Sequence, residues 1–143
     1  MAALGNERHT EDAQNWLALQ PPDELFISDW VITEFSSAMA LKLRSGQIQT
    51  DQRAECLAVF AQLVERSLTV LPVSSADFRA AARLVDHYQT GLRAGDALHL
   101  ATCAKHGARM ITLDKTLAAA ATTLGIPAPN WREASSWTRS GTY

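Results

Sequence analysis

The stretch Leu25-Phe26-Ile27-Ser28-Asp29-Trp30-Val31-Ile32-Thr33-Glu34-Phe35 decides the fold of this chain. It begins with a short apolar run over residues 25–28, which is typical of a buried strand. A helical pattern follows at once and continues to about Arg44, where Ser45-Gly46 ends it. A strand that leads directly into a helix is the repeating unit of a parallel α/β domain.

The rest of the chain continues this alternation of short strands and helices. The apolar runs at 68–73 and 109–113 predict two further strands, and residues 126–129 predict a short edge strand. Parallel sheets of this kind place their functional sites at the carboxyl ends of the strands. Helices are expected at 7–19, 50–66 with Thr50 or Asp51 as N-cap, 75–87 with Ser75 as N-cap, 94–106 and 117–124.

The composition indicates one ordinary domain over residues 1–143. The chain is 47% hydrophobic, which excludes a disordered tail, and no repeat or linker divides it. No apolar stretch approaches the roughly 20 residues of a membrane span, and the start lacks a signal-peptide core, so we expect a cytoplasmic protein. The formal charge of -2 gives no global basic field, so nucleic-acid binding would depend on a local patch.

Three carboxylates stand out because each follows or opens an apolar segment. Glu34 lies in the helix after the first strand, Asp96 opens the helix after Gly95, and Asp114 ends the third predicted strand. A carboxylate in apolar surroundings needs a cation, a cluster of donors or a route to solvent. Hard divalent cations prefer oxygen ligands, so the three acids predict a Mg²⁺ or Mn²⁺ site.

Each acid also has a plainer interpretation. Asp96 and Asp114 can both be helix N-caps, and Glu34 can be a surface side chain. Other chemistries fit less well, because the chain has no G-x-S-x-G, G-x-x-x-x-G-K or H-E-x-x-H motif. His99 and Cys103 could form half of a zinc site, but no second ligand pair accompanies them. Cys56 and Cys103 lack a C-x-x-C spacing and are expected to be buried reduced thiols.

Three segments together resemble a known family. They are Ile27 to Phe35, Gly91-Leu92-Arg93-Ala94-Gly95-Asp96-Ala97-Leu98-His99-Leu100-Ala101, and Ile111-Thr112-Leu113-Asp114-Lys115-Thr116-Leu117. In this order they are similar to the downstream motifs of PIN-domain proteins, and more narrowly to VapC-type ribonuclease toxins of type II toxin–antitoxin pairs. The resemblance implies a three-layer α/β/α fold with a short parallel sheet. It also implies an Mg²⁺- or Mn²⁺-dependent endoribonuclease that binds an antitoxin protein and forms a homodimer.

The resemblance assigns the catalytic and metal-binding roles to Glu34, Asp96 and Asp114. The expected reaction is metal-assisted hydrolysis of an RNA phosphodiester bond, in which bound metal activates water and neutralises the leaving oxygen. Asp96 and Asp114 are the expected ligands, and Glu34 is a ligand or positions the attacking water. Arg93 or Lys115 would hold the scissile phosphate.

One departure from the family concerns the start of the chain. The family begins with a strand that ends in Asp-Thr-Ser, whereas residues 1–7 look like the segment just after it, so we expect the N-terminal strand and its aspartate to be missing. Asp12 does not replace that aspartate, because it lies on the first predicted helix. A catalytically inactive PIN-like fragment that binds an antitoxin or another protein is therefore the alternative, and a small scaffold whose acids are all caps is the third interpretation.

Overall fold

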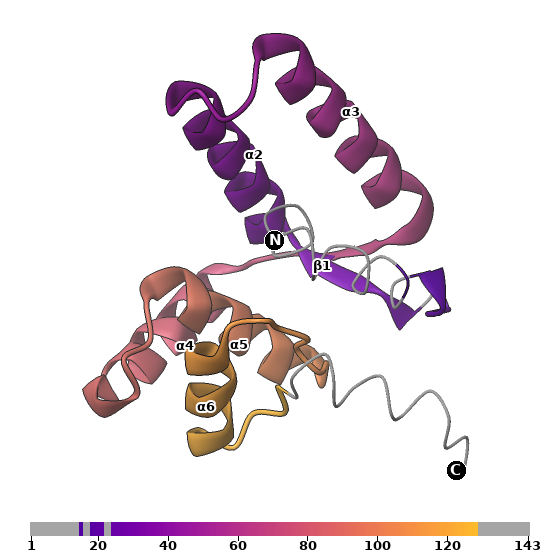
Figure 1. The fold of residues 1–143 in the computed structure, drawn as a ribbon. Coiled ribbons are helices and arrows are strands. Elements are labelled where there is room, and N and C mark those ends of the chain that lie inside the picture. The colour runs from indigo at the N-terminus through magenta and orange to yellow at the C-terminus, as the bar shows by residue number, and fades with distance from the viewer. Residues whose placement is uncertain (1–14, 16–17, 22–23, 129–143) are drawn as a thin grey trace. The chain divides into compact units, whose positions relative to one another are not determined.

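The apolar run before Asp29 forms a strand, as its composition predicts. The computed structural model describes residues 15, 18–21 and 24–128, and in it strand β1 is Phe26–Ser28 and strand β2 is Thr69–Leu71 (Figure 1). The strands pair in parallel, with Ile27 opposite Val70. This pair is the whole sheet formed by the described residues. The predicted α/β class with a short parallel sheet is confirmed.

The described residues divide into two units, and the first is Gln20–Pro72. After β1 the chain forms helix α2, Asp29–Arg44, and after a short loop it forms helix α3, Thr50–Ser67. The bounds of α2 are those that the sequence predicts. In the sequence the two helices lie between β1 and β2. Figure 1 shows them side by side.

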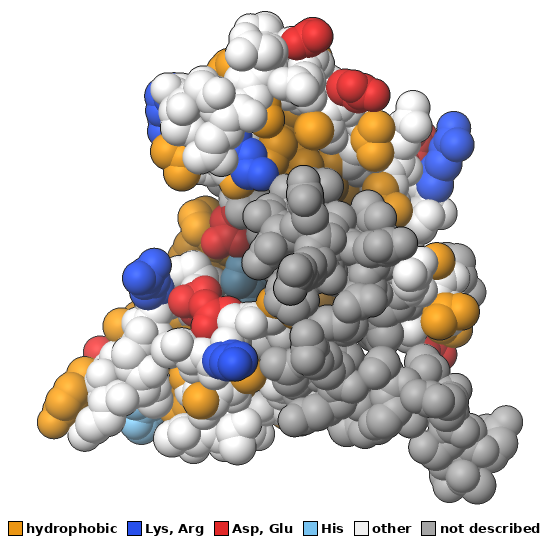
Figure 2. All heavy atoms as spheres, viewed as in Figure 1, with side chains coloured by type: hydrophobic (Ala, Val, Ile, Leu, Met, Phe, Trp, Pro, Cys, Tyr) orange, Lys and Arg blue, Asp and Glu red, His pale blue; other side chains and the backbone are white. Residues whose placement is uncertain are grey.

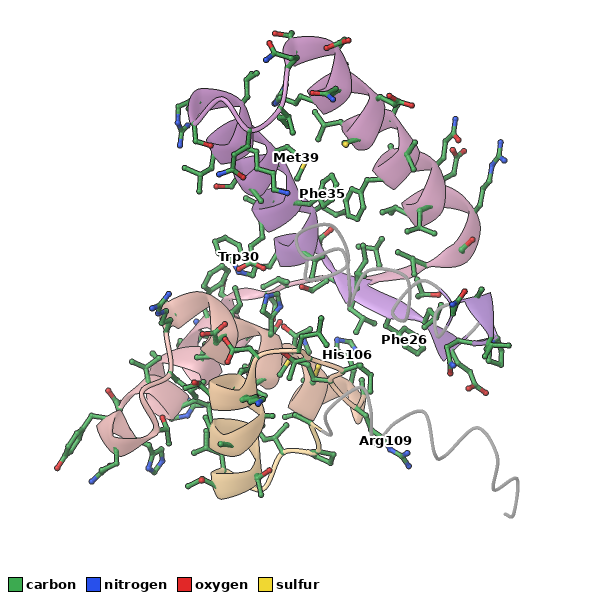
Figure 3. All side chains as sticks on the ribbon, in the orientation of Figure 1. Phe26, Trp30, Phe35, Met39, His106 and Arg109 are labelled. Carbon is green, nitrogen blue, oxygen red and sulfur yellow. The ribbon has the colours of Figure 1, made fainter. Side chains whose placement is uncertain are left out.

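The α2–α3 pair is held by aromatic packing. The rings of Phe35 and Phe60 stack with their centroids 4.0 Å apart and an interplanar angle of 15°. Met39, one turn further along α2, is also buried, and Figure 3 shows both α2 side chains on the side of α3. The positions i and i+4 share a helix face, so this stripe fixes which face of α2 meets α3.

The second unit contains the described residues from Val73 onward. Its centre is Leu100, which is fully buried. The surrounding core consists of Leu117, Ala121, Ile126 and Ala128, with Leu84, Leu92, Met110 and Leu124 packed against it. Its helices are α4, Ser75–Val85; the 3₁₀ helix η3, Tyr88–Thr90; α5, Ala94–His106; and α6, Lys115–Thr123.

Several predicted helix ends were wrong by one or two residues. The N-cap of α3 is Gln49, not Thr50 or Asp51, because Gln52 accepts a hydrogen bond of 2.8 Å from the Gln49 amide. The N-cap of α4 is Ser74, not Ser75, and α4 ends at Val85 instead of His87. In both cases a residue one position earlier completes a reciprocal capping box.

The predicted strands at 109–113 and 126–129 are not regular strands in the part that the structure describes. Thr112 forms only an isolated bridge, and the Met110 amide donates to the Pro127 carbonyl at 3.1 Å. Proline has no N–H, so Pro127 cannot donate a second backbone hydrogen bond to the facing segment. The two segments are therefore joined by this hydrogen bond without forming a regular ladder among the described residues.

Some expectations fall outside these residues. Of the helix predicted over 7–19, only Asn15, Ala18 and Leu19 are described, and the first two are helical. The predicted lack of an N-terminal strand concerns a segment outside the described residues. The single domain over residues 1–143 stays a prediction. No helix within 24–128 is long and apolar enough to cross a membrane.

Candidate active site

Asp96 lies in the first turn of α5, not at its N-cap. Gly91, with φ 66°, turns the chain, and Arg93 is the extended N-cap residue without a side-chain cap bond. Asp96 is half-buried and makes no hydrogen bond or ion pair with a described residue. The cap interpretation is therefore wrong for Asp96. Its negative charge near a helix N-terminus is favourable, and both carboxylate oxygens are left for another partner.

Asp114 is the N-cap of α6. Its Oδ1 accepts from the Thr116 amide at 2.8 Å and from the Leu117 amide at 3.1 Å. Its own amide donates to Thr112 Oγ1 at 3.0 Å, which closes the turn before the helix. The cap interpretation is confirmed here, but it uses one carboxylate oxygen. Oδ2 makes no hydrogen bond with the described residues, and Asp114 is exposed.

Glu34 lies in α2, in the other unit. It is half-buried, and its side chain has an interaction partner, so it is not the unpaired carboxylate that its apolar neighbours suggest. Two polar atoms near the start of the same helix, Ser28 Oγ and Trp30 Nε1, are buried without a hydrogen-bond partner among the described residues. Buried polar atoms without partners are uncommon, and they occur where water, an ion or a catalytic group belongs.

The most deeply buried carboxylate among the described residues was not predicted. Asp77, in the first turn of α4, is 2% exposed and accepts from the Ser74 amide and hydroxyl, each at 2.7 Å. The Ser74 amide, then its hydroxyl and then the Lys105 ammonium lower the pKa of Asp77 from 3.8 to about 2, against the effect of burial. The signal was present in the sequence, because Ser74-Ser75-Ala76-Asp77 has the spacing of a capping box.

A comparison with protein families gives a match over most of the chain. The model of the PIN domain matches residues 1–122. The chain belongs to the PIN-domain family. No curated protein matches it. PIN domains are generally nucleases that act on RNA and use divalent metal ions, so the fold and the nuclease class expected from the three motifs are supported.

In this PIN domain the acids fit a hard divalent cation by their chemistry. Asp96 and Asp114 belong to one unit, each opens a helix, and each offers a carboxylate oxygen that makes no hydrogen bond with a described residue. Glu34 belongs to the other unit. In residues 24–128 no three His, Cys, Asp or Glu side chains gather to hold one metal ion. The available oxygens suit Mg²⁺ or Mn²⁺.

The cysteines differ from their prediction. Cys56 and Cys103 are both free, as expected, but they are half-buried and not fully buried. Burial raises the pKa of the Cys103 thiol, which keeps it in the neutral form. A neutral thiol is a poor zinc ligand, because zinc binds the thiolate.

Proposed function

We propose that this PIN domain is a metal-dependent endoribonuclease that hydrolyses RNA phosphodiester bonds. The observation that carries the proposal is Asp96, a half-buried carboxylate in the first turn of α5 that neither caps the helix nor pairs with a described side chain. A half-buried carboxylate whose oxygens accept no hydrogen bond from a described residue is available for a ligand. Asp114, with one uncommitted oxygen in the same unit, is its expected companion.

The proposed roles of the acids follow from their hydrogen bonds. Asp96 and Asp114 would hold Mg²⁺ or Mn²⁺ directly or through water, with Asp114 keeping its cap through Oδ1 and offering Oδ2. Glu34 would be a further ligand or would orient the attacking water. The bound ion would supply a lowered pKa for its water and charge neutralisation at the phosphate. Arg93 or Lys115, both exposed, would contact the scissile phosphate.

We also propose the finer assignment to the toxin component of a type II toxin–antitoxin pair in the cytoplasm, with an antitoxin and a second copy of the chain as partners. The support is the resemblance of the three motifs to VapC-type toxins. Pairs of large apolar side chains are also exposed together on two helices. They are Val59 and Leu63, one turn apart on α3, and Phe78 and Val85, two turns apart on α4.

These exposed apolar residues also favour the second candidate function. A PIN-like fragment without activity could still bind an antitoxin or another protein through such faces. The two candidates differ in what the acids do. If the protein is a binding module, replacing Asp96 changes neither metal binding nor RNA cleavage.

Cleavage of a structured RNA in the presence of Mn²⁺ tests the proposal, with the chain purified away from any antitoxin. Wild-type protein should cut the RNA and give a heat of Mn²⁺ binding by calorimetry, whereas Asp96→Asn and Asp114→Asn should lose both. Asp51→Asn, an exposed first-turn acid of α3, is the matched control and should keep both. Equal heats and equal cleavage in all four proteins, or none in any, would overturn the nuclease proposal.

A further inference from the structure

A groove lies between η3 and α6, within one unit of the protein. Its volume is about 400 Å³, and it is open to solvent. A depression this open leaves a bound group in contact with solvent on one side, as for an extended chain lying along the surface. The lining residues are Gln89, Thr90, Lys115, Thr116, Ala119, Ala120 and Thr123.

The two walls of the groove are joined to the two acids of the same unit. The α6 wall begins at Lys115, the residue after Asp114, and the Thr116 amide donates to the Asp114 carboxylate at 2.8 Å. The η3 wall leads through Gly91 and the N-cap Arg93 into the first turn of α5, which contains Asp96. In the sequence, Asp114 directly precedes the first lining residue of α6, and Asp96 follows the last lining residue near η3 by six positions.

The polar groups of the groove suit a nucleic-acid backbone. The Gln89 amide, the Lys115 ammonium and the Thr116 hydroxyl are exposed and make no hydrogen bond with a described residue. Thr90 and Thr123, in contrast, donate to the carbonyls of His87 and Ala119. Lysine, threonine and glutamine are side chains that bind phosphate and sugar oxygens.

The charge of the groove also favours an anionic strand. None of the seven lining residues is acidic, and Lys115 gives it one positive charge. On the face drawn in Figure 2, the unit with α4, α5 and α6 has acidic and basic side chains next to one another and no broad basic field. On this face an RNA contact would therefore be local. No aromatic side chain lines the groove, so its contacts would be to backbone and not to bases.

We propose that the groove between η3 and α6 holds a backbone segment of single-stranded RNA beside Asp114, with Lys115 on a phosphate and with Gln89 and Thr116 on phosphate or ribose oxygens. This inference rests on the proposed ribonuclease function and adds the path of the substrate. The small side chains of Ala119 and Ala120 leave room for the strand. An open groove suits a chain that passes through it.

A charge test at Ala119 is the sharpest experiment, because Ala119 lines the groove, is exposed and lies in a helix. Ala119→Glu and Ala119→Lys introduce side chains of similar length and good helix propensity but opposite charge. Thr122 is exposed on the same helix and does not line the groove, so Thr122→Glu and Thr122→Lys form the matched control pair. Binding is measured by fluorescence anisotropy with a fluorescein-labelled oligouridine in EDTA, where no cleavage occurs.

The expected result is a difference between the two positions. Ala119→Glu should raise the Kd about tenfold or more relative to Ala119→Lys, since the new carboxylate would face phosphates. The Thr122 pair should differ by much less. A difference at Ala119 no larger than that at Thr122 would overturn the inference.

A second variant keeps the test independent of the folding of the Ala119 proteins. Lys115→Gln should lower the slope of log Kd against log salt by about 0.7, the value for one phosphate contact on a single strand. An unchanged slope contradicts the contact. Mn²⁺-dependent cleavage by wild type separates the two proposals. If wild type cleaves RNA and the variants bind like wild type, the groove alone is wrong; if wild type neither binds nor cleaves, both are wrong.

Discussion

Lys105 near the end of α5 donates to Asp77 in the first turn of α4, with a distance of 3.0 Å between Nζ and Oδ2. Lys105 Nζ also lies 3.2 Å from Ser74 Oγ, so one ammonium joins the capping box of α4 to the helix that carries Asp96. The carboxylate is buried while the Lys105 side chain is 43% exposed. Replacing Asp77 and replacing Lys105 should therefore lower the free energy of unfolding by different amounts.

Asp77→Asn should lower the free energy of unfolding by about 2 kcal/mol, because the shift of the Asp77 pKa from 3.8 to about 2 is lost. Lys105→Met should cost about 1 kcal/mol or less, since the half-exposed ion pair is screened while the Ser74 bonds remain. Urea unfolding of both variants and the double variant gives the coupling energy. The control Asp51→Asn, at an exposed first-turn acid, should change stability by less than about 0.5 kcal/mol. A loss as large in the control would contradict a special role for Asp77.

The stability from Asp77 should depend on pH with a definite sign. The pKa is lower in the folded protein than its ordinary value, so the contribution is complete above 3.8 and disappears as the pH falls through about 2. Wild type should exceed Asp77→Asn by about 2 kcal/mol near pH 5 and by much less near pH 2. Urea unfolding at the two pH values measures this. An equal gap at both would mean that Asp77 acts through shape and not through charge.

Two substitutions at Asp114 should separate its role as an N-cap from its proposed role as a metal ligand. Asparagine is as good an N-cap as aspartate, so Asp114→Asn should keep stability within about 0.5 kcal/mol, whereas Asp114→Ala should lose about 1 kcal/mol. Both variants should lose Mn²⁺ binding, because neither keeps the carboxylate. Thermal unfolding and calorimetry on the same samples give the two readouts. If Asp114→Asn kept the heat of Mn²⁺ binding, Asp114 would be an N-cap and not a metal ligand.

Much of the fold could be predicted because the signals are local. The bounds of α2 and α5 follow from an apolar strand or a glycine before each helix and from a glycine after it. The third strand could not be predicted correctly, because whether 109–113 becomes regular depends on its neighbours, and one of them contains Pro127 without an N–H.

The candidate site was predicted in part for a similar reason. That Asp114 is an N-cap follows from the helical residues just after it. Whether Asp96 is an N-cap depends on where α5 begins, and Gly91 and Arg93 decide this. The groove joins residues 89–90 to residues 115–123, and no local pattern shows that they meet. The sequence suggests Arg93 or Lys115 as the phosphate contact. Gln89 and Thr116, the further contacts that we propose, have no local pattern that sets them apart from other surface side chains.

Tyr88 provides a last test of the RNA path. It opens η3, directly before the groove residue Gln89, and it is 80% exposed. An exposed aromatic ring beside a backbone groove is suited to stack a base, at about 1–3 kcal/mol per base. Tyr88→Ala should therefore raise the Kd for oligouridine by about fivefold or more, while Tyr88→Phe, which keeps the ring face, should bind like wild type. Anisotropy titrations measure both. Equal losses in the two variants would assign the effect to the hydroxyl, and no loss in either would place the bases elsewhere.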